Sequence, residues 1–300
     1  MRKRMRWTVS ILGGLVLLAL LVAAAAQLLS ARKMQRTIAV AVAPVALPTD
    51  PARIAHGRYL YSTRGCTECH GANGAGKTVV DSDGMLVVAP NITGGANSAT
   101  NRYTVTDWVR TIRHGVKPNG QPVLVMPSED YARLTDEDAG ALVAYLQHMP
   151  PQQGERRRVE LPLPVKLLYA VGAIKDAAEK IDHTLAPPRA QRAAMTPEYG
   201  AYVAQACVGC HGAQFSGGAI PGAPPSWPHA ANLTPGPGSA MARYPSPDSF
   251  VTMLRSGKRP DGSAISPVMP FDSFGRMNDV DARALYAYLV TLPARPGGQH

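Results

Sequence analysis

Two short stretches of the chain, Cys66-Thr67-Glu68-Cys69-His70 and Cys207-Val208-Gly209-Cys210-His211, share the pattern C-x-x-C-H. This pattern is the attachment signature of a c-type haem. The two cysteines form thioether bonds with the haem vinyl groups, and the histidine supplies an axial nitrogen to the iron. The chain contains four cysteines, so both motifs together use all of them. The sequence therefore predicts two covalently bound haem c groups.

Other roles for the four cysteines fit the spacing less well. In a zinc ribbon the two cysteine pairs lie about 15–20 residues apart, whereas Cys69 and Cys207 are separated by a far longer stretch. A thioredoxin-like redox pair needs neither the trailing histidine nor a second copy. Disulfides between the pairs remain an alternative in an oxidising compartment.

Residues 1–36 are predicted to form a membrane anchor. An uncharged run, Trp7–Ala31, is flanked by basic residues: Arg2, Lys3, Arg4 and Arg6 before it, and Arg32, Lys33 and Arg36 after it. As a helix this run is long enough to cross about 30 Å of hydrocarbon. The slight excess of basic residues in front favours an amino terminus on the inside. We therefore expect a protein of the inner (cytoplasmic) membrane with its haem domains on the periplasmic side.

A cleaved signal peptide is the alternative for this segment, because Ala23 to Ala26 offer small-residue cleavage sites. The uncleaved anchor is favoured because the apolar run exceeds a usual signal-peptide core. In both cases the remainder of the chain is exported, as covalent haem attachment outside the cytoplasm requires.

The formal net charge of +10 does not indicate a nucleic-acid partner. Seven of the ten excess positive charges lie in residues 1–36, which contain no acidic residue and leave +3 for the rest. Haem propionates bring the remainder closer to neutrality. We therefore expect no nucleic-acid binding.

Residues 50–151 are predicted to form a first haem domain. Helices are expected over 53–63, before the motif, and from Thr106, as the N-cap, to His114. A last helix is expected after Thr135, which with Asp138 resembles a capping box. Glycines that follow the motif, at 71, 74 and 76, let the backbone pass close to a flat cofactor.

Met126 is the predicted second axial ligand of the first iron, opposite His70. It lies in a short loop between two helices and is followed by Pro127. Its thioether is a soft ligand suited to a low-spin electron carrier. The competing ligands in this domain are two methionines and three histidines, namely Met85, Met149, His56, His114 and His148.

Residues 195–294 repeat the first domain in order. Ala231-Asn232-Leu233-Thr234 matches Pro90-Asn91-Ile92-Thr93, and Asp261-Gly262 matches the Asn119-Gly120 turn. Met269, followed by Pro270, occupies the place of Met126 and is the predicted ligand opposite His211. Helices are expected over 198–206, 248–254 and 277–292.

Two differences between the repeats bear on the haem pockets. Pro90 is replaced by Ala231, near which a backbone carbonyl is expected to accept a hydrogen bond from the ring N–H of the haem histidine. The proline-rich stretch 221–228 is extra in the second copy and is expected to reshape one edge of its pocket.

Residues 152–194 are predicted to be a linker. It contains the charge run Glu155–Arg158 and an expected helix over Lys166–Ile181. The expected helix carries an apolar stripe of Leu167, Leu168, Val171, Ile174 and Ala178. Such a stripe packs on the protein's own domain or docks a partner subunit, and the sequence leaves both open.

These motifs and their order resemble class I cytochromes c in tandem. More narrowly, C-x-x-C-H, P-N-I-T, Tyr103 to Trp108, the N-G or D-G turn, M-P and L-T-D-E-D are similar to the haem domains of one subfamily. These are the membrane-associated cytochrome c subunits of periplasmic alcohol and aldehyde dehydrogenases. The resemblance implies a mainly α fold and ligation by His70 with Met126 and by His211 with Met269.

The resemblance also implies an electron-transfer subunit, not an enzyme. Its partners are a catalytic dehydrogenase subunit as donor and quinone or a terminal oxidase or cytochrome as acceptor. One alternative is the haem c subunit of a cbb3-type oxidase, because a membrane anchor followed by two haem c domains suits that role too. Another is a dihaem enzyme, a peroxidase or thiosulfate-oxidising cytochrome, which needs one iron with a vacant or displaceable ligand.

Overall fold

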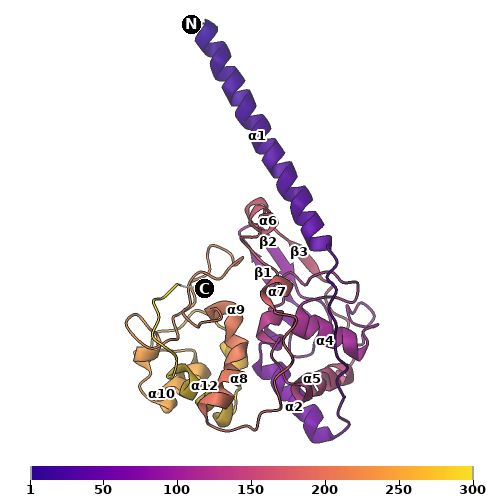
Figure 1. Cartoon of the computed structure of the whole chain (residues 1–300), viewed down its shortest axis with the longest axis vertical. Coiled ribbons are helices and arrows are strands. Elements are labelled where there is room, and N and C mark those ends of the chain that lie inside the picture. Colours follow the sequence, from indigo (N-terminus) through magenta and orange to yellow (C-terminus); the bar gives the residue numbers. More distant parts are fainter. Residues whose placement is uncertain (1, 299–300) are drawn as a thin grey trace.

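The computed structural model describes residues 2–298 (Figure 1). A long helix leads into two small helical domains, and a connecting segment packs between the helix and the first domain. The mainly α fold predicted from the sequence is confirmed.

The N-terminal helix α1 (Arg2–Gln35) projects from the body of the molecule (Figure 1). Over Lys3–Gln35 it is long and apolar enough to cross a membrane, and it is the single such helix in residues 2–298. Most of its apolar side chains are exposed, but Ala26 and Ser30 near its end are buried against the rest of the chain.

The first domain is built from five helices and a hairpin. They are α2 (Pro51–Thr63), α3 (Cys66–His70), β1 (Thr78–Ser82), β2 (Met85–Val88), α4 (Val105–His114), η1 (Ser128–Asp130) and α5 (Asp136–His148). The helix predicted over 53–63 is confirmed as α2, with Asp50 as its N-cap.

The predicted cap of α4 is wrong by two residues. The N-cap is Thr104, whose hydroxyl accepts from the Asp107 backbone N–H while the Asp107 carboxylate accepts from the Thr104 backbone N–H. Thr106 lies inside the helix because only Thr104 has an acidic residue three positions later to complete this exchange. Thr135 is confirmed as the N-cap of α5, but the Asp138 carboxylate bonds His56 and Tyr202 instead of returning to Thr135.

The second domain repeats this plan without the hairpin. Its elements are α8 (Pro197–Val203), η2 (Ala204–Cys207), α9 (Val208–His211), η3 (Met241–Arg243), α10 (Pro247–Ser256), α11 (Phe271–Phe274) and α12 (Asp279–Leu289). The helix predicted over 198–206 changes to a tighter 3₁₀ turn after Val203. The helix predicted over 277–292 is shorter, since Asn278 caps it and it ends at Leu289.

In both domains the first helix crosses the last helix at a glycine. A β-carbon on Gly57 would lie 2.0 Å from the carbonyl oxygen of Ala141, and one on Gly200 would lie 1.9 Å from that of Ala284. A side chain at either position would force the helices apart. The crossing helices are α2 and α5 in the first domain and α8 and α12 in the second. In each domain the haem motif follows the first of these helices and therefore lies beside the hydrophobic core.

A small antiparallel sheet joins the connecting segment to the first domain. β1 and β2 are linked by the two-residue turn Asp83-Gly84, and β3 (Arg158–Glu160) pairs with β2 so that Val87 faces Val159. Residues 158–160 are therefore held on the first domain by a strand ladder, and Glu155 is held by backbone hydrogen bonds with Ala75 and Asn91. The sequence analysis did not predict this arrangement.

The single helix predicted over 166–181 is wrong. The segment forms two helices, α6 (Leu163–Ala170) and α7 (Ala177–Lys180). The break contains Gly172 at φ +80°, a left-handed conformation that ends α6. The apolar stripe is consequently divided: Ala178 is buried, whereas Leu167, Leu168 and Val171 are exposed.

This segment packs against the foot of α1. Tyr169 donates to the Asp176 carboxylate at 2.7 Å, and the Arg36 guanidinium donates to the same carboxylate at 2.9 Å. Lys33 donates to the Tyr169 carbonyl at 3.0 Å and pairs with Glu179 at 3.1 Å. The end of α1 is thus fixed to the body by buried and half-buried charges.

α7 is also joined to the first domain through two histidines. The Nδ1 atoms of His114 and His183 lie 3.0 Å apart, and His183 Nε2 lies 3.0 Å from the Ala178 carbonyl. Such a contact needs one nitrogen as donor and one as acceptor, so both rings cannot be charged. Burial, and then the neighbouring His183, lower the pKa of His114 from 6.5 to about 4.

Between pH 6.5 and 4 the unfolded chain binds a proton at His114 that the folded protein does not bind. We expect the contribution of this contact to stability to be complete above pH 6.5 and to be lost as the pH falls towards 4. Urea unfolding at a series of pH values measures it. In His114→Asn the loss between pH 6.5 and 4 should shrink, while in His229→Asn, at an exposed position, it should match the wild type. Identical slopes in the wild type and His114→Asn would contradict this assignment.

Candidate functional site

Each C-x-x-C-H motif forms a single helical turn, and none of the four cysteines forms a disulfide. The first motif is held at both ends by buried tyrosines. Tyr61 donates to the Gly71 carbonyl at 2.6 Å, and Tyr131 donates to the Arg64 carbonyl at 3.0 Å. Burial raises the pKa of the Cys66 thiol as long as its sulfur is not bonded to haem.

Both motif histidines are oriented by a backbone carbonyl. His70 Nδ1 lies 2.9 Å from the Pro90 oxygen, and His211 Nδ1 lies 2.8 Å from the Ala231 oxygen. The carbonyl can only accept, so Nδ1 carries the hydrogen and Nε2 carries the lone pair that a metal needs. Burial lowers the pKa of His70, which keeps its ring neutral. The expected carbonyl acceptor is therefore confirmed in both domains. The backbone carbonyl of Ala231 accepts this hydrogen bond in the second domain as that of Pro90 does in the first.

A buried asparagine and threonine shape the turn that presents this carbonyl. Asn91 Oδ1 accepts from the Thr93 backbone N–H at 2.9 Å and from its hydroxyl at 2.8 Å. Asn232 and Thr234 repeat both bonds at the same distances. The sequence analysis used these residues only to align the repeats. The signal for their role was the recurrence of Asn-x-Thr directly after the acceptor residue.

The same asparagines reach the chain beyond the last helix of each domain. Asn91 Nδ2 donates to the Gln152 carbonyl at 2.7 Å, and Asn232 Nδ2 donates to the Arg295 carbonyl at 2.9 Å. The turn behind each histidine is thus tied to the end of its own domain.

In the second domain three of the four predicted site residues line one cavity. Cys207, His211 and Met269 surround it together with apolar side chains such as Phe250, Leu254 and Leu285. The cavity and its open mouth together contain about 740 Å³ of space that protein atoms do not fill. Met253 also lines it, but it belongs to the buried core of α10.

The chemistry of this cavity fits a haem. An imidazole with its lone pair on Nε2, a thioether and an apolar wall are the groups that a porphyrin and its iron require. Arg243 and Arg259 also line the cavity and match the negative charge of the two propionates. Haem would therefore be held here by Cys207, Cys210, His211 and Met269.

The proline-rich stretch 221–228 does not shape this cavity, so that prediction is wrong. Trp227 packs instead against the hairpin residues Val80, Met85 and Val87, and Ser226 donates to Asp83 at 2.9 Å. The exposed hairpin of the first domain offers an apolar face that the stretch covers. It therefore connects the two domains.

In the first domain Cys66 and Met126 pack against the same core, which includes Leu60, Trp108 and Leu142. Of the two competing methionines, Met85 is buried in the separate cluster under the hairpin, whereas Met149 is buried in the same core that Met126 packs against.

The three competing histidines have other partners as well. His56 Nε2 lies 2.8 Å from Asp138, His114 pairs with His183, and His148 Nδ1 lies 2.7 Å from the carbonyl of Ala144 in its own helix.

Comparison with known proteins agrees with this geometry. Residues 52–146 match the family model described as Cytochrome C oxidase, cbb3-type, subunit III, and residues 198–293 match the family model described as Cytochrome c. The chain carries two cytochrome c domains. The two covalently bound haem c groups predicted from the motifs follow from this membership.

Three of the similar proteins are cytochrome subunits of dehydrogenases. The chain is 28% identical over 310 residues to the fructose dehydrogenase cytochrome subunit of Gluconobacter japonicus, over 89% of this chain and 60% of the relative. It is 26% identical to the alcohol dehydrogenase (quinone) cytochrome c subunit of Gluconobacter oxydans (strain 621H), over 84% and 57%. It is also 26% identical to the gluconate 2-dehydrogenase cytochrome c subunit of Pantoea cypripedii, over 83% and 62%.

The resemblance predicted from the motifs is confirmed by these relatives. The chain spans about three fifths of their length.

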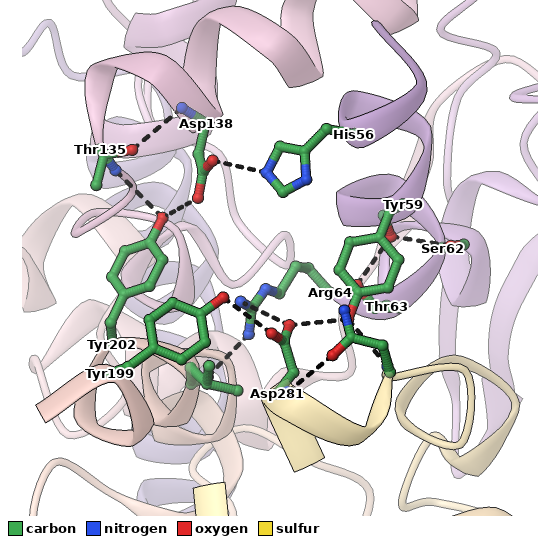
Figure 2. Close-up of polar contacts among 12 residues, drawn as sticks. His56, Tyr59, Ser62, Thr63, Arg64, Thr135, Asp138, Tyr199, Tyr202 and Asp281 are labelled. Atoms are coloured by element: carbon green, nitrogen blue, oxygen red, sulfur yellow. Dashed lines mark hydrogen bonds and ion pairs between the residues drawn. The ribbon is translucent and has the colours of Figure 1, made fainter. Parts of the chain in front are cut away.

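The two cytochrome c domains meet at a buried polar interface centred on Arg64, the residue that caps α2 just before the first motif (Figure 2). Its guanidinium donates to the Val203 carbonyl at the end of α8 at 2.9 Å and lies 3.8 Å from the Asp281 carboxylate. Tyr59 and Tyr199 donate to the two oxygens of Asp281, each at 2.8 Å. Asp281 thus binds side chains of both domains.

Asp138 has the corresponding role at the other end of the interface (Figure 2). Asp138 and Asp281 occupy the same place near the start of the last helix in their respective domains. Asp138 accepts from His56 of its own domain and from Tyr202 of the second domain. These hydrogen bonds hold the pKa of Asp138 below its usual range in spite of burial.

Each haem motif also touches the methionine loop of the other domain. Ser273, four residues after Met269, bonds Thr67 at 2.9 Å and Glu68 at 2.6 Å. Asp130, four residues after Met126, accepts from the Gly209 backbone N–H at 2.5 Å. The residues between the two cysteines of each motif therefore lie in the domain interface.

Tyr59→Phe tests the interface. The change removes a hydrogen bond to the buried Asp281 and an acceptor for the Asn278 backbone N–H. We expect a loss of about 1.5–3 kcal/mol of unfolding free energy, the usual range for a bond to a charged group. Chemical unfolding of the holoprotein measures it. The control is Tyr288→Phe, whose ring packs on Phe215 within the second domain, with an expected change below about 0.5 kcal/mol. Equal effects of the two changes would count against the interface.

Proposed function

We propose that this chain is a dihaem electron-transfer subunit. It takes electrons from a catalytic dehydrogenase subunit of the alcohol or aldehyde type and passes them to the respiratory chain, through quinone or a terminal oxidase or cytochrome. The observation that carries the proposal is that both haem motifs meet at one domain interface. The names of the dehydrogenase relatives support the choice of donor.

Haem iron supplies reversible one-electron oxidation and reduction when it is bound. The chain's own residues hold and tune it: Cys66 and Cys69, or Cys207 and Cys210, fix the porphyrin edge, and the motif histidine binds the iron. Met126 and Met269 would each supply a thioether to the iron of their own domain. An iron bound by the porphyrin, a histidine and a methionine would have no place left for a substrate, so catalysis would belong to the partner.

The membrane anchor belongs to the same proposal. α1 crosses the inner membrane with its amino terminus inside, which leaves both cytochrome c domains on the periplasmic side. The composition and length of α1 support this orientation together with the basic residues in front of the apolar run.

The ligand assignment makes a prediction for each methionine. Met126→Ala and Met269→Ala should each remove the thioether–iron charge-transfer absorption of one site and lower the midpoint potential of that site by more than about 59 mV, a tenfold change in its redox equilibrium. Absorption spectroscopy and redox titration of the holoprotein measure both effects.

The controls are methionines of the same two domains. Met253→Leu changes a residue that lines the same cavity as Met269, and Met149→Leu changes a buried core residue of the first domain. Both should keep the thioether absorption and shift the potentials little. Loss of that absorption in a control, or its persistence in Met126→Ala and Met269→Ala, would overturn the assignment.

The haem c subunit of a cbb3-type oxidase is the second candidate, because residues 52–146 match that family model. A mild-detergent pull-down of the tagged native chain, with partners identified by mass spectrometry, separates the candidates. We expect a large catalytic dehydrogenase subunit. An oxidase core in its place would establish the second candidate, and a chain that is isolated alone would contradict both.

A further inference from the structure

The helix α6 of the connecting segment turns its apolar side outwards. Leu163, Leu167, Leu168 and Val171 are 41%, 38%, 44% and 68% exposed. Leu163, Leu167 and Val171 are spaced by four residues and therefore follow one stripe of the helix. An exposed leucine is common by itself, but a stripe of four on one short helix is the pattern of an interaction surface.

The opposite side of α6 is fixed, so the stripe cannot turn inwards. Val165 packs against the hydrophobic cluster under the hairpin. Tyr169 is buried and bonds Asp176 and Arg36 through its hydroxyl. α6 therefore differs from the usual surface helix. The hydroxyl of Tyr169 makes its polar contacts inside the protein, and the apolar stripe faces solvent.

α6 lies beside the last turns of α1 (Figure 1). Lys166 donates to the Gln27 side chain at 3.0 Å, and Lys33 donates to the Tyr169 carbonyl at 3.0 Å. The part of the uncharged run that precedes the polar Gln27, residues Trp7–Ala26, is about 30 Å long at 1.5 Å per residue. That length equals the hydrocarbon thickness of a bilayer, so α6 lies at the level where α1 leaves the hydrocarbon.

The charges around α6 match a phospholipid surface. Arg32 in α1 and Lys175 just before α7 are exposed. Arg156 and Arg157 are exposed just before β3, and Arg158 is exposed at its start, where it pairs with Glu160. Basic side chains that flank an exposed apolar helix are typical of segments that lie in the interface of an anionic membrane.

We propose that α6 is a second membrane contact, which inserts Leu163, Leu167, Leu168 and Val171 between the lipid headgroups and the acyl chains. The inference rests on the proposed anchoring by α1. One helix alone leaves the body free to rotate and tilt about the anchor. A second contact, held rigidly to α1 by Lys33, Arg36 and Lys166, fixes which face of the two cytochrome c domains points away from the membrane.

Photo-crosslinking of the full-length holoprotein tests the proposal. The photoreactive residue p-benzoylphenylalanine replaces Leu168 in α6, Leu18 in α1, or Val290 at the end of α12, which is 43% exposed and thus matched to Leu168. The protein is reconstituted into vesicles of phosphatidylethanolamine and phosphatidylglycerol, irradiated, and analysed for lipid adducts by mass spectrometry.

We expect the lipid-adduct yield at position 168 to lie within about threefold of that at position 18, and at least tenfold above that at position 290. A yield at 168 no higher than at 290, with position 18 still labelled, would overturn the contact by α6 while leaving the anchor intact. No adduct at position 18 would refute the proposed anchor and the second contact with it.

Crosslinking of the same variants in native membranes tests whether a partner polypeptide, instead of lipid, covers the apolar stripe of α6. Lipid adducts at position 168 support the proposal there as well. Adducts to another polypeptide, in place of lipid, would assign the apolar stripe to a partner subunit and overturn the membrane contact.

Discussion

The burial of Arg64 between the two domains is the constraint on which the arrangement of the sites depends. A guanidinium taken out of water is costly unless its charge and hydrogen bonds are satisfied. Asp281, the Val203 carbonyl and the ring of Tyr202 offset part of that cost, and all three belong to the second domain, while Arg64 Nε has no hydrogen-bond partner among the described residues. Arg64 lies two residues before Cys66, and Val203 lies four residues before Cys207. The hydrogen bond between the Arg64 side chain and the Val203 carbonyl therefore brings the two motifs close together.

The interface also shows how a repeated sequence produces an asymmetric pair of sites. Asp138 and Asp281 are equivalent, yet Asp281 faces a buried arginine, whereas Asp138 faces a histidine. Likewise, the second motif contacts a carboxylate, that of Asp130, and the first contacts a hydroxyl, that of Ser273. Burial raises the pKa of Asp130 well above its usual range, and the first motif contains a carboxylate of its own, Glu68. The two motifs therefore meet different polar groups across the interface.

The motifs, the repeat and the helices could be predicted from the sequence because each rests on local signals. C-x-x-C-H and the carbonyl behind each histidine needed only short spacings. The hairpin could also have been predicted, because Asp83-Gly84 lies between two valine-rich runs, a pattern typical of a β-hairpin. It was missed because a wholly helical domain was expected. The interface could not be predicted, since Arg64, Tyr59 and Asp281 are brought together only by the packing of two domains. The division of the linker helix at Gly172 likewise followed from the packing of Tyr169 and Asp176 on α1.

The hydrogen bonds from Asn91 to Gln152 and from Asn232 to Arg295 have a consequence for biosynthesis. Each joins the turn behind a motif histidine to a residue that the ribosome adds only after the last helix of that domain. A chain that ends before Gln152 or Arg295 would leave the turn behind the corresponding histidine without this hydrogen bond, and the imidazole would lose part of its support.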